Sequence, residues 1–220
     1  GYDPMLIQIG QFKEPFSLEE ATSNRYLTFI ERNMAVNAFS DNDNAYKTGF
    51  ALGYSQPRWQ VKGALQTEST GGGGATSSTS GTAFNGNTNR TGGMGDQGWG
   101  VTGRVTGLPW YEDKTKFLHL GASGSTRQIN QSAQGGIKFA SALDTNVDRT
   151  FLLNTNTLTV DRVNRYGAEQ AFVYGPFSTQ AEYIQTNTTN RNNTSNTFDG
   201  YYAYASYFLT GESRSYKTST

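Results

Sequence analysis

The sequence contains repeated segments of about ten residues in which apolar and polar side chains alternate, and these segments are joined by connectors of very different length. Alternation with a period of two places successive side chains on opposite faces of a β-strand. In one segment, Trp59, Val61 and Leu65 fall on the same face. Lys62 and Gln66 fall on the opposite face. Each such strand has one apolar and one wet face, which predicts a sheet that separates two different environments.

Eight segments fit this pattern, and we expect all of them to be strands. They run from Met5 to Lys13, Tyr46 to Ser55, Trp59 to Glu68, Trp99 to Leu108, Lys116 to Arg127, Tyr166 to Tyr174, Phe177 to Thr186 and Gly200 to Leu209. A tilted strand needs about 10 residues to cross a bilayer, and most of the segments are close to that length. The pattern therefore predicts transmembrane strands.

The connectors alternate between short and long along the chain. The short ones are Gln56 to Arg58, Leu108 to Tyr111, Gly175 to Pro176 and Leu209 to Gly211. The long ones are Glu14 to Ala45, Ser69 to Gly98, Gln128 to Arg165 and Asn187 to Asp199. If neighbouring strands are antiparallel, all long connectors lie at one end of the sheet, as outer-membrane barrels require of their extracellular loops. A soluble sandwich has no reason to sort its loops in this way.

Composition limits the remaining classes of protein. The 18 Lys and Arg residues balance the 18 Asp and Glu residues, so no net field would attract nucleic acid. No window approaches the roughly 20 apolar residues of a membrane-spanning helix. Two readings remain open: an all-β antiparallel transmembrane barrel that acts as a channel, and a soluble secreted β-rich binding module that uses its long Asn/Thr-rich loops. Aromatic residues near the short connectors, such as Trp59, Tyr174 and Phe177, favour the barrel, whose interfaces carry girdles of such rings.

The first long connector carries a helix signal. Ser17, Leu18, Glu19 and Glu20 form a capping box, with Ser17 as the N-cap and Glu20 at the third helical position. A short helix within a long barrel loop predicts that the loop folds into the lumen and supplies charge at a narrowing. A helix in a solvated loop outside the barrel is the alternative.

The residues needed for enzyme chemistry are scarce. The chain has one His, no Cys, and no Gly-rich phosphate loop followed by Lys-Ser or Lys-Thr. We expect His119 to be a hydrogen-bonding residue of the lumen. Glu169 and Glu182 lie on facing strands, and two lumen carboxylates balanced by Arg or Lys explain them more simply than a catalytic acid pair. We therefore expect a protein without catalytic residues, bound metal or cofactor.

Several short stretches resemble the phosphate-selective porin O and P family and occur in the same order as in that family. They are Ile9 to Glu20 followed by Leu27 to Arg32, Leu118 to Gly121 after a Leu-Pro turn, Gly175 to Ser178 before Glu182 and Tyr183, and Ser206 to Arg214. Each stretch alone has modest specificity, but together they span nearly the whole chain. This resemblance extends from the first predicted strand to the connector after the last.

The resemblance implies a barrel of about sixteen strands that assembles as a homotrimer in the bacterial outer membrane. Basic side chains on inward-folded loops would then conduct small inorganic anions, and outer-membrane lipid would surround the barrel. Residues 1–220 are expected to form a single, incomplete barrel domain whose N- and C-terminal strands are missing. Nucleic acid is not an expected partner.

One position departs from the family pattern. In phosphate-selective members, the resemblance implies a Lys at the position of Glu20 and an Arg at the position of Arg32, which together frame the anion site. Here Arg32 is present, but Glu20 replaces the Lys. A carboxylate at a narrow, poorly hydrated point should weaken the binding of a doubly charged oxyanion. We therefore expect a mildly anion-preferring pore without tight phosphate binding.

The candidates for the pore constriction and the anion-binding site are charged residues of the first long connector and of the wet strand faces: Arg32, Arg25, Glu20, Lys13, Arg104, Lys62 and Arg127. Arg58, Lys114 and Lys116 belong to short turns and are excluded. The orientation of the arginines before Tyr166 cannot be read from the sequence, because a loop has no period: Arg149, Arg162 and Arg165.

Overall fold

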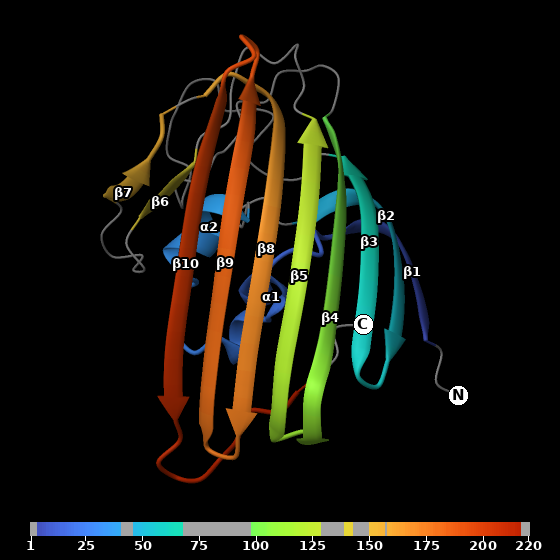
Figure 1. Ribbon diagram of the computed structural model, residues 1–220, viewed down its shortest axis with the longest axis vertical. Helices are drawn as coiled ribbons and strands as arrows, with labels where there is room; N and C mark the ends of the chain where they lie inside the picture. The colour runs from blue at the N-terminus through green and yellow to red at the C-terminus, as the bar shows by residue number, and fades with distance from the viewer. Residues whose placement is uncertain are drawn as a thin grey trace.

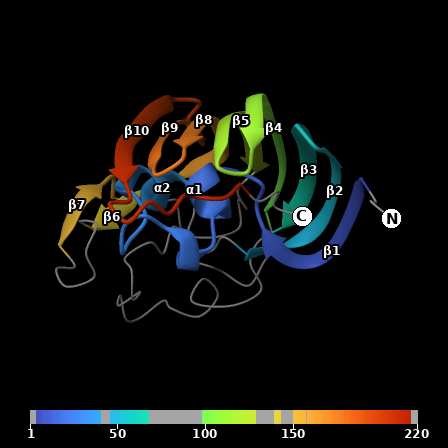
Figure 2. The same ribbon diagram turned by 90° about the horizontal axis from the view of Figure 1, so that it is seen from below.

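The computed structural model describes residues 4–40, 46–67, 98–128, 139–142, 150–156 and 158–216. Eight strands form one antiparallel sheet in the order β1-β2-β3-β4-β5-β8-β9-β10 (Figure 1). Their bounds are β1 Met5–Lys13, β2 Tyr46–Gln56, β3 Trp59–Thr67, β4 Trp99–Asp113, β5 Lys116–Gln128, β8 Val160–Tyr174, β9 Phe177–Asn190 and β10 Ser195–Tyr207. All eight predicted strands are confirmed. Seen along the strands, the sheet curves around a concave side, with β1 and β10 as its edges (Figure 2).

Two predicted connectors are wrong. Leu108 to Tyr111 is not a turn, because β4 continues through it with register shifts between Gly107 and Asp113. Leu108 is buried and packs with Phe117. The irregular pairing here tolerates Pro109, which has no backbone N–H to donate to the neighbouring strand. The segment Asn187 to Asp199 is not a long loop either. Its Thr and Asn residues pair through the backbone of β9 and β10, so only residues 191–194 separate the two strands.

The remaining long connectors all leave the sheet at the same end, as the antiparallel order requires. The connector between β5 and β8 contains a two-stranded sheet that the sequence analysis missed, formed by β6 (Ala140–Ala142) and β7 (Phe151–Asn154). Most of the predicted loop Ser69 to Gly98 lies outside the described residues. Within the described part of the chain, no helix is long and apolar enough to span a membrane.

The two faces of the sheet have opposite polarity. On the convex face, large apolar side chains are exposed, including Ile9 at 79% and Trp59 at 46%. On the concave face, Gln66 and Thr102 are buried at 1%. A soluble sandwich would bury the apolar face instead. An exposed apolar face and a buried polar face are typical of the wall of a membrane barrel, and they speak against the soluble binding module.

The concave side is occupied by the segment that follows β1. Residues 14–40, which we call the constriction loop, contain α1 (Leu18–Ala21), the 3₁₀ helix η1 (Asn24–Tyr26) and α2 (Met34–Phe39) (Figure 2). Phe16, Val36 and Phe39 of the loop pack in one buried cluster with Ile184 of β9. A Cβ atom at Gly200 of β10 would lie 2.7 Å from the Ala35 Cβ, so this close approach of α2 needs a glycine. The predicted inward fold of the loop is confirmed.

Candidate functional site

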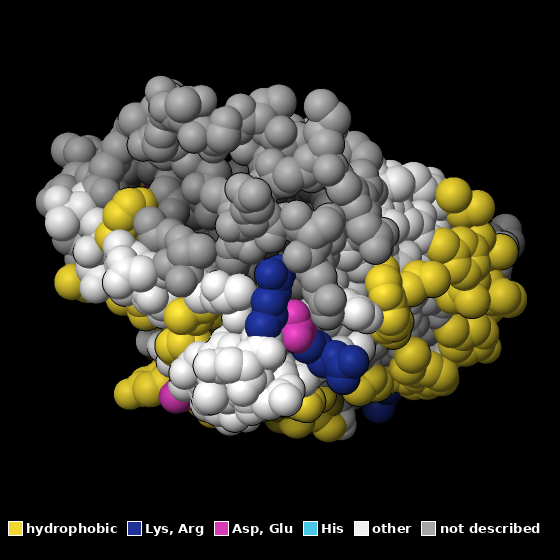
Figure 3. Space-filling model, turned by 90° about the horizontal axis from the view of Figure 1, so that it is seen from above, with side chains coloured by type: hydrophobic (Ala, Val, Ile, Leu, Met, Phe, Trp, Pro, Cys, Tyr) yellow, Lys and Arg dark blue, Asp and Glu magenta, His cyan; other side chains and the backbone are white. Residues whose placement is uncertain are grey.

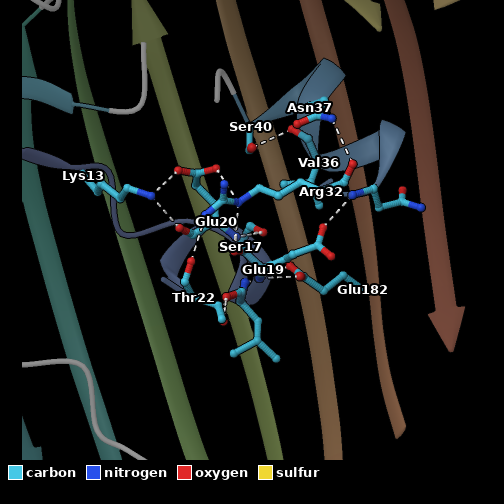
Figure 4. A network of polar contacts seen from close by, with 12 residues as sticks. Lys13, Ser17, Glu19, Glu20, Thr22, Arg32, Val36, Asn37, Ser40 and Glu182 are labelled. Atoms are coloured by element: carbon cyan, nitrogen blue, oxygen red, sulfur yellow. Dashed lines mark hydrogen bonds and ion pairs between the residues drawn. The ribbon is translucent and has the colours of Figure 1, made fainter. Parts of the chain in front are cut away.

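The first helix of the constriction loop is anchored to the wall by a carboxylate. Ser17 caps α1 as predicted, because its Oγ accepts a hydrogen bond from the Glu20 N–H at 3.2 Å. The N–H groups of Leu18 and Glu19 donate to the two carboxylate oxygens of Glu182 on β9, at 2.9 and 2.7 Å. Free N–H groups at the start of a helix favour an anion there. The wall therefore supplies the charge that holds α1 in place (Figure 4).

The loop begins with a second anchor at Glu14, which is 4% exposed. Its Oε1 lies 2.6 Å from the Arg165 Nη2, its Oε2 lies 2.6 Å from the Lys47 Nζ, and the Arg127 Nη2 is 3.8 Å away. Burial alone would raise the pKa of the Glu14 carboxyl, but Arg165, Lys47 and Arg127 outweigh it and hold this pKa well below the usual range. One carboxylate of the loop thus forms ion pairs with three basic side chains of the wall.

Glu20 lies between two basic side chains. The Lys13 Nζ is 2.8 Å from its Oε1, and the Arg32 Nε is 3.4 Å from its Oε2 (Figure 4). Burial raises the pKa of Glu20 despite the opposing effect of both cations. The Arg32 guanidinium also donates to the backbone carbonyls of Glu19 and Thr22, at 3.2 and 2.8 Å. Arg32 therefore binds the loop itself and is only 7% exposed.

The two facing carboxylates of the wall have different partners. Glu169 is directly opposite Glu182 in the pairing of β8 with β9. The Arg104 guanidinium forms a bidentate ion pair with Glu169 at 2.5 and 3.1 Å, and the His119 Nε2 lies 2.8 Å from the same carboxylate. Among the described residues, Glu182 is held by backbone N–H groups and by the Tyr202 hydroxyl instead. The predicted balance by Arg or Lys is confirmed for Glu169 and wrong for Glu182.

A small cavity of about 110 Å³ lies between the constriction loop and the wall. It is lined by Lys13, Glu14, Pro15, Ala21, Gln60, Lys62, Arg104 and Thr106. Lys62 and Arg104 are direct neighbours across β3 and β4. The Lys62 Nζ donates to the Gln8 Oε1 at 3.1 Å, and within the described chain no carboxylate forms an ion pair with it. The cavity thus brings together three basic side chains, of which Lys13 and Arg104 each have an acidic partner.

The predicted site residues divide into groups. Lys13, Lys62 and Arg104 meet at the cavity, and Glu20 and Arg32 adjoin it through Lys13. Arg127 does not line the cavity but is buried beside Glu14, which does. Arg25 is exposed in η1. Viewed from above, basic and acidic side chains lie next to one another, and hydrophobic side chains gather along the right-hand edge of the molecule (Figure 3).

The structure shows the orientation of two of the three arginines that precede Tyr166. Arg165 points inward to Glu14 and lies over the Phe16 ring at 4.9 Å, whereas Arg162 is exposed and Arg149 lies outside the described residues. Glu14 and Lys47 are site residues that were not predicted from the sequence. Lys47 lies on the polar face of β2, and the alternation of that strand indicates that its side chain faces inward. Glu14 follows the end of β1, where no alternation of side chains indicates an orientation.

Comparison with known proteins agrees with this geometry. Residues 1–220 match the family model described as phosphate-selective porin O and P. Porin O of Pseudomonas aeruginosa is 30% identical over 234 residues, which cover 99% of this chain and 49% of that protein. An uncharacterized protein of Caulobacter vibrioides is 28% identical over 214 residues, which cover 97% of this chain and 40% of that protein. The chain spans less than half the length of either relative, and it belongs to the phosphate-selective porin O and P family.

Proposed function

We propose that the chain forms part of a passive channel for small hydrophilic solutes with a mild preference for anions. The chain is located in the bacterial outer membrane. The observation that carries the preference is the cavity beside the constriction loop, where Lys13, Lys62 and Arg104 meet. A ring of basic side chains at a narrowing lowers the energy of a passing anion and raises that of a cation.

The preference is mild because most of the cationic charge is neutralised. Glu20 pairs with Lys13, and Glu169 pairs with Arg104. Lys62 remains as the basic side chain that has no acidic partner among the described residues. A doubly charged oxyanion would have to compete with the two carboxylates for the same donors. Phosphate-type anions therefore pass without tight binding, although the family is described as phosphate-selective.

The proposal includes the barrel and the oligomer that the family resemblance implies. Residues 1–220 contribute to a single barrel domain, and the exposed apolar side chains of the convex face contact outer-membrane lipid. Three copies form a homotrimer. Small inorganic anions are the transported partners, and no catalytic step is involved.

Reversal potentials of the full-length protein in planar bilayers test the proposal. Under a KCl gradient we expect a reversal potential on the chloride side of zero. Lys62→Gln should move it toward zero, because the substitution removes the cation that has no acidic partner. Arg58→Gln is the matched control, since it removes the same charge from an exposed turn where salt screens it. A protein that forms no channels, or a shift with Arg58→Gln but none with Lys62→Gln, would contradict the proposal.

A further inference from the structure

Six side chains on the concave side form one continuous chain of hydrogen bonds. We call it the relay, and it runs from donor to acceptor through Arg214, Thr28, Tyr204, Gln180, Tyr202 and Glu182. Every group donates to the next one, from a guanidinium at one end to a carboxylate at the other. A hydroxyl has a single hydrogen to donate, so each hydroxyl of the relay uses its donor on the next member.

The first half of the relay joins the constriction loop to a segment that is far away in the sequence. Residues 208–216 follow β10 and turn back across the concave side (Figure 2). There the Arg214 Nη2 donates to the Thr28 Oγ1 at 2.7 Å, and its Nη1 donates to the Tyr26 carbonyl at 3.3 Å. Thr28 in turn donates to the Tyr204 hydroxyl at 2.8 Å. The loop is thereby held between β10 and the segment after it.

The second half of the relay reaches the same loop at another point. The Tyr204 hydroxyl donates to the Gln180 Oε1 at 2.9 Å, and the Gln180 Nε2 donates to the Tyr202 hydroxyl at 2.6 Å. Tyr202 donates to Glu182, the carboxylate that also receives the N–H groups at the start of α1. A single network therefore tethers the constriction loop both at α1 and at Thr28.

The middle of the loop depends on polar tethers, because residues 23–31 contain no buried side chain. The buried apolar residues of the loop, Phe16, Val36 and Phe39, lie on either side of this stretch. The Phe29 and Tyr204 rings meet edge to face with 5.3 Å between their centroids, but the Phe29 side chain is 60% exposed. Apolar packing alone thus gives this stretch little to hold it against the wall.

We propose that the relay sets the position of the constriction loop in the lumen, and that Tyr204, Gln180 and Tyr202 are positioning residues of the pore. This inference rests on the proposed channel function. The relay runs from part-buried hydrogen bonds at Arg214 and Thr28 to a buried one between Tyr202 and Glu182, and its members polarise one another, so loss of one member weakens the others. Loss of the Thr28 link removes one tether of residues 23–31 while the hydrogen bond from Arg214 to the Tyr26 carbonyl remains, so this stretch moves more widely in the ion path.

Single-channel recording of the full-length protein in planar bilayers tests the inference. Tyr204→Phe and Thr28→Val each remove one hydroxyl and leave the shape nearly unchanged. We expect each to increase the frequency of brief partial closures about fivefold, which corresponds to the about 1 kcal/mol of one net hydrogen bond. The reversal potential should not change, because neither substitution alters a charge. Thr28→Ser keeps the hydroxyl and should restore wild-type behaviour.

The double variant separates a relay from independent contacts. Thr28 and Tyr202 share no hydrogen bond, so if they act in one network, Thr28→Val combined with Tyr202→Phe should be no worse than the stronger of the two single variants. Tyr201→Phe is the matched control, since its ring lies one residue from Tyr202 on the convex face and is 77% exposed. Additive effects in the double variant, or single variants that behave like Tyr201→Phe, would overturn the inference and leave the channel function intact. A wild-type protein without conductance would overturn both.

Discussion

Glu14, the first residue of the constriction loop, and Arg165, in the middle of β8, form a buried ion pair with 2.6 Å between Oε1 and Nη2. The same guanidinium donates to the Phe39 carbonyl near the end of the loop, at 3.1 Å. One arginine of the wall therefore holds both ends of the loop. Such a buried pair fixes a conformation more than it adds stability, because desolvation offsets much of the attraction.

Glu14→Gln should destabilise the protein strongly. The substitution leaves Arg165, Lys47 and Arg127 crowded together without the carboxylate that joins them. Removal of one partner from a buried charged group costs about 3–5 kcal/mol. The free energy of unfolding can be measured by denaturant titration in detergent. Glu112→Gln is the control, because its ion pair with Lys116 is half-exposed, and it should change stability by less than about 1 kcal/mol.

The Glu14 carboxylate should make the free energy of unfolding depend on pH in the acidic range. The pKa of Glu14 in the folded protein is well below the usual value, so its contribution is fully present above the ordinary carboxyl range, near pH 4.3. That contribution is lost as the pH falls through the lowered folded-state pKa. Unfolding measured from pH 7 down to strongly acidic conditions should show this loss in the wild type. If Glu14→Gln retained the same acid dependence, another group would be responsible.

The strands could be predicted from the sequence because each one must present an apolar convex face and a polar concave face. The period of two in Trp59, Val61 and Leu65 follows directly from that requirement, and the structure confirms it. The signal fails where neither face of a strand carries apolar side chains. In β9 and β10 the residues before and after the connector are Thr, Asn and Ser on both faces, so no apolar side chains alternate with them, although Thr188 is buried and pairs with Asn196 in the sheet.

The site was predicted less completely than the fold. Lys62 and Arg104 could be assigned to the lumen because they lie on strands with a readable period. Glu14 and the relay could not, because their partners are far apart in sequence: 151 residues separate Glu14 from Arg165, and 186 separate Thr28 from Arg214. Contacts of this kind depend on how the loop packs against the wall. Local pattern carries no information about them.

Glu20→Gln should increase anion preference. The substitution removes the carboxylate between Lys13 and Arg32, so Lys13 presents its charge to the cavity. Glu20→Lys should act in the same direction and more strongly, and it should also strengthen phosphate block of chloride current. Reversal potential and block are measured in planar bilayers. Arg58→Ala is the control and should leave both unchanged, because it alters an exposed turn.

The same residue predicts a pH effect on selectivity. Burial raises the pKa of Glu20, so the neutral acid becomes populated at a higher pH than for an exposed carboxyl. Lowering the pH from neutral should therefore release Lys13 and Arg32 and move the reversal potential further to the chloride side. Glu14 remains ionised over this interval because its pKa is lowered. An identical pH response in Glu20→Gln would rule out Glu20 as the titrating group.

Arg32→Lys separates two roles that the arginine could play. If Arg32 acted only as a positive charge, lysine would replace it. The structure instead shows its Nε and Nη2 donating to the Glu19 and Thr22 carbonyls, a geometry that the single ammonium of lysine cannot reproduce. We expect Arg32→Lys to lower the free energy of unfolding by about 1–3 kcal/mol, and Arg32→Ala to lower it at least as much.

The reversal potential and the open-channel noise are a second test of the role of Arg32. Arg32 is 7% exposed, and its charge is shared with Glu20, so Arg32→Lys should leave the reversal potential nearly unchanged while open-channel noise increases. Arg25→Lys is the matched control, because Arg25 lies in the same loop and is exposed, and neither stability nor noise should change. Wild-type stability and noise in Arg32→Lys would show that the charge alone matters there. The constriction loop would then be held by Glu14, Glu182 and the relay without help from Arg32.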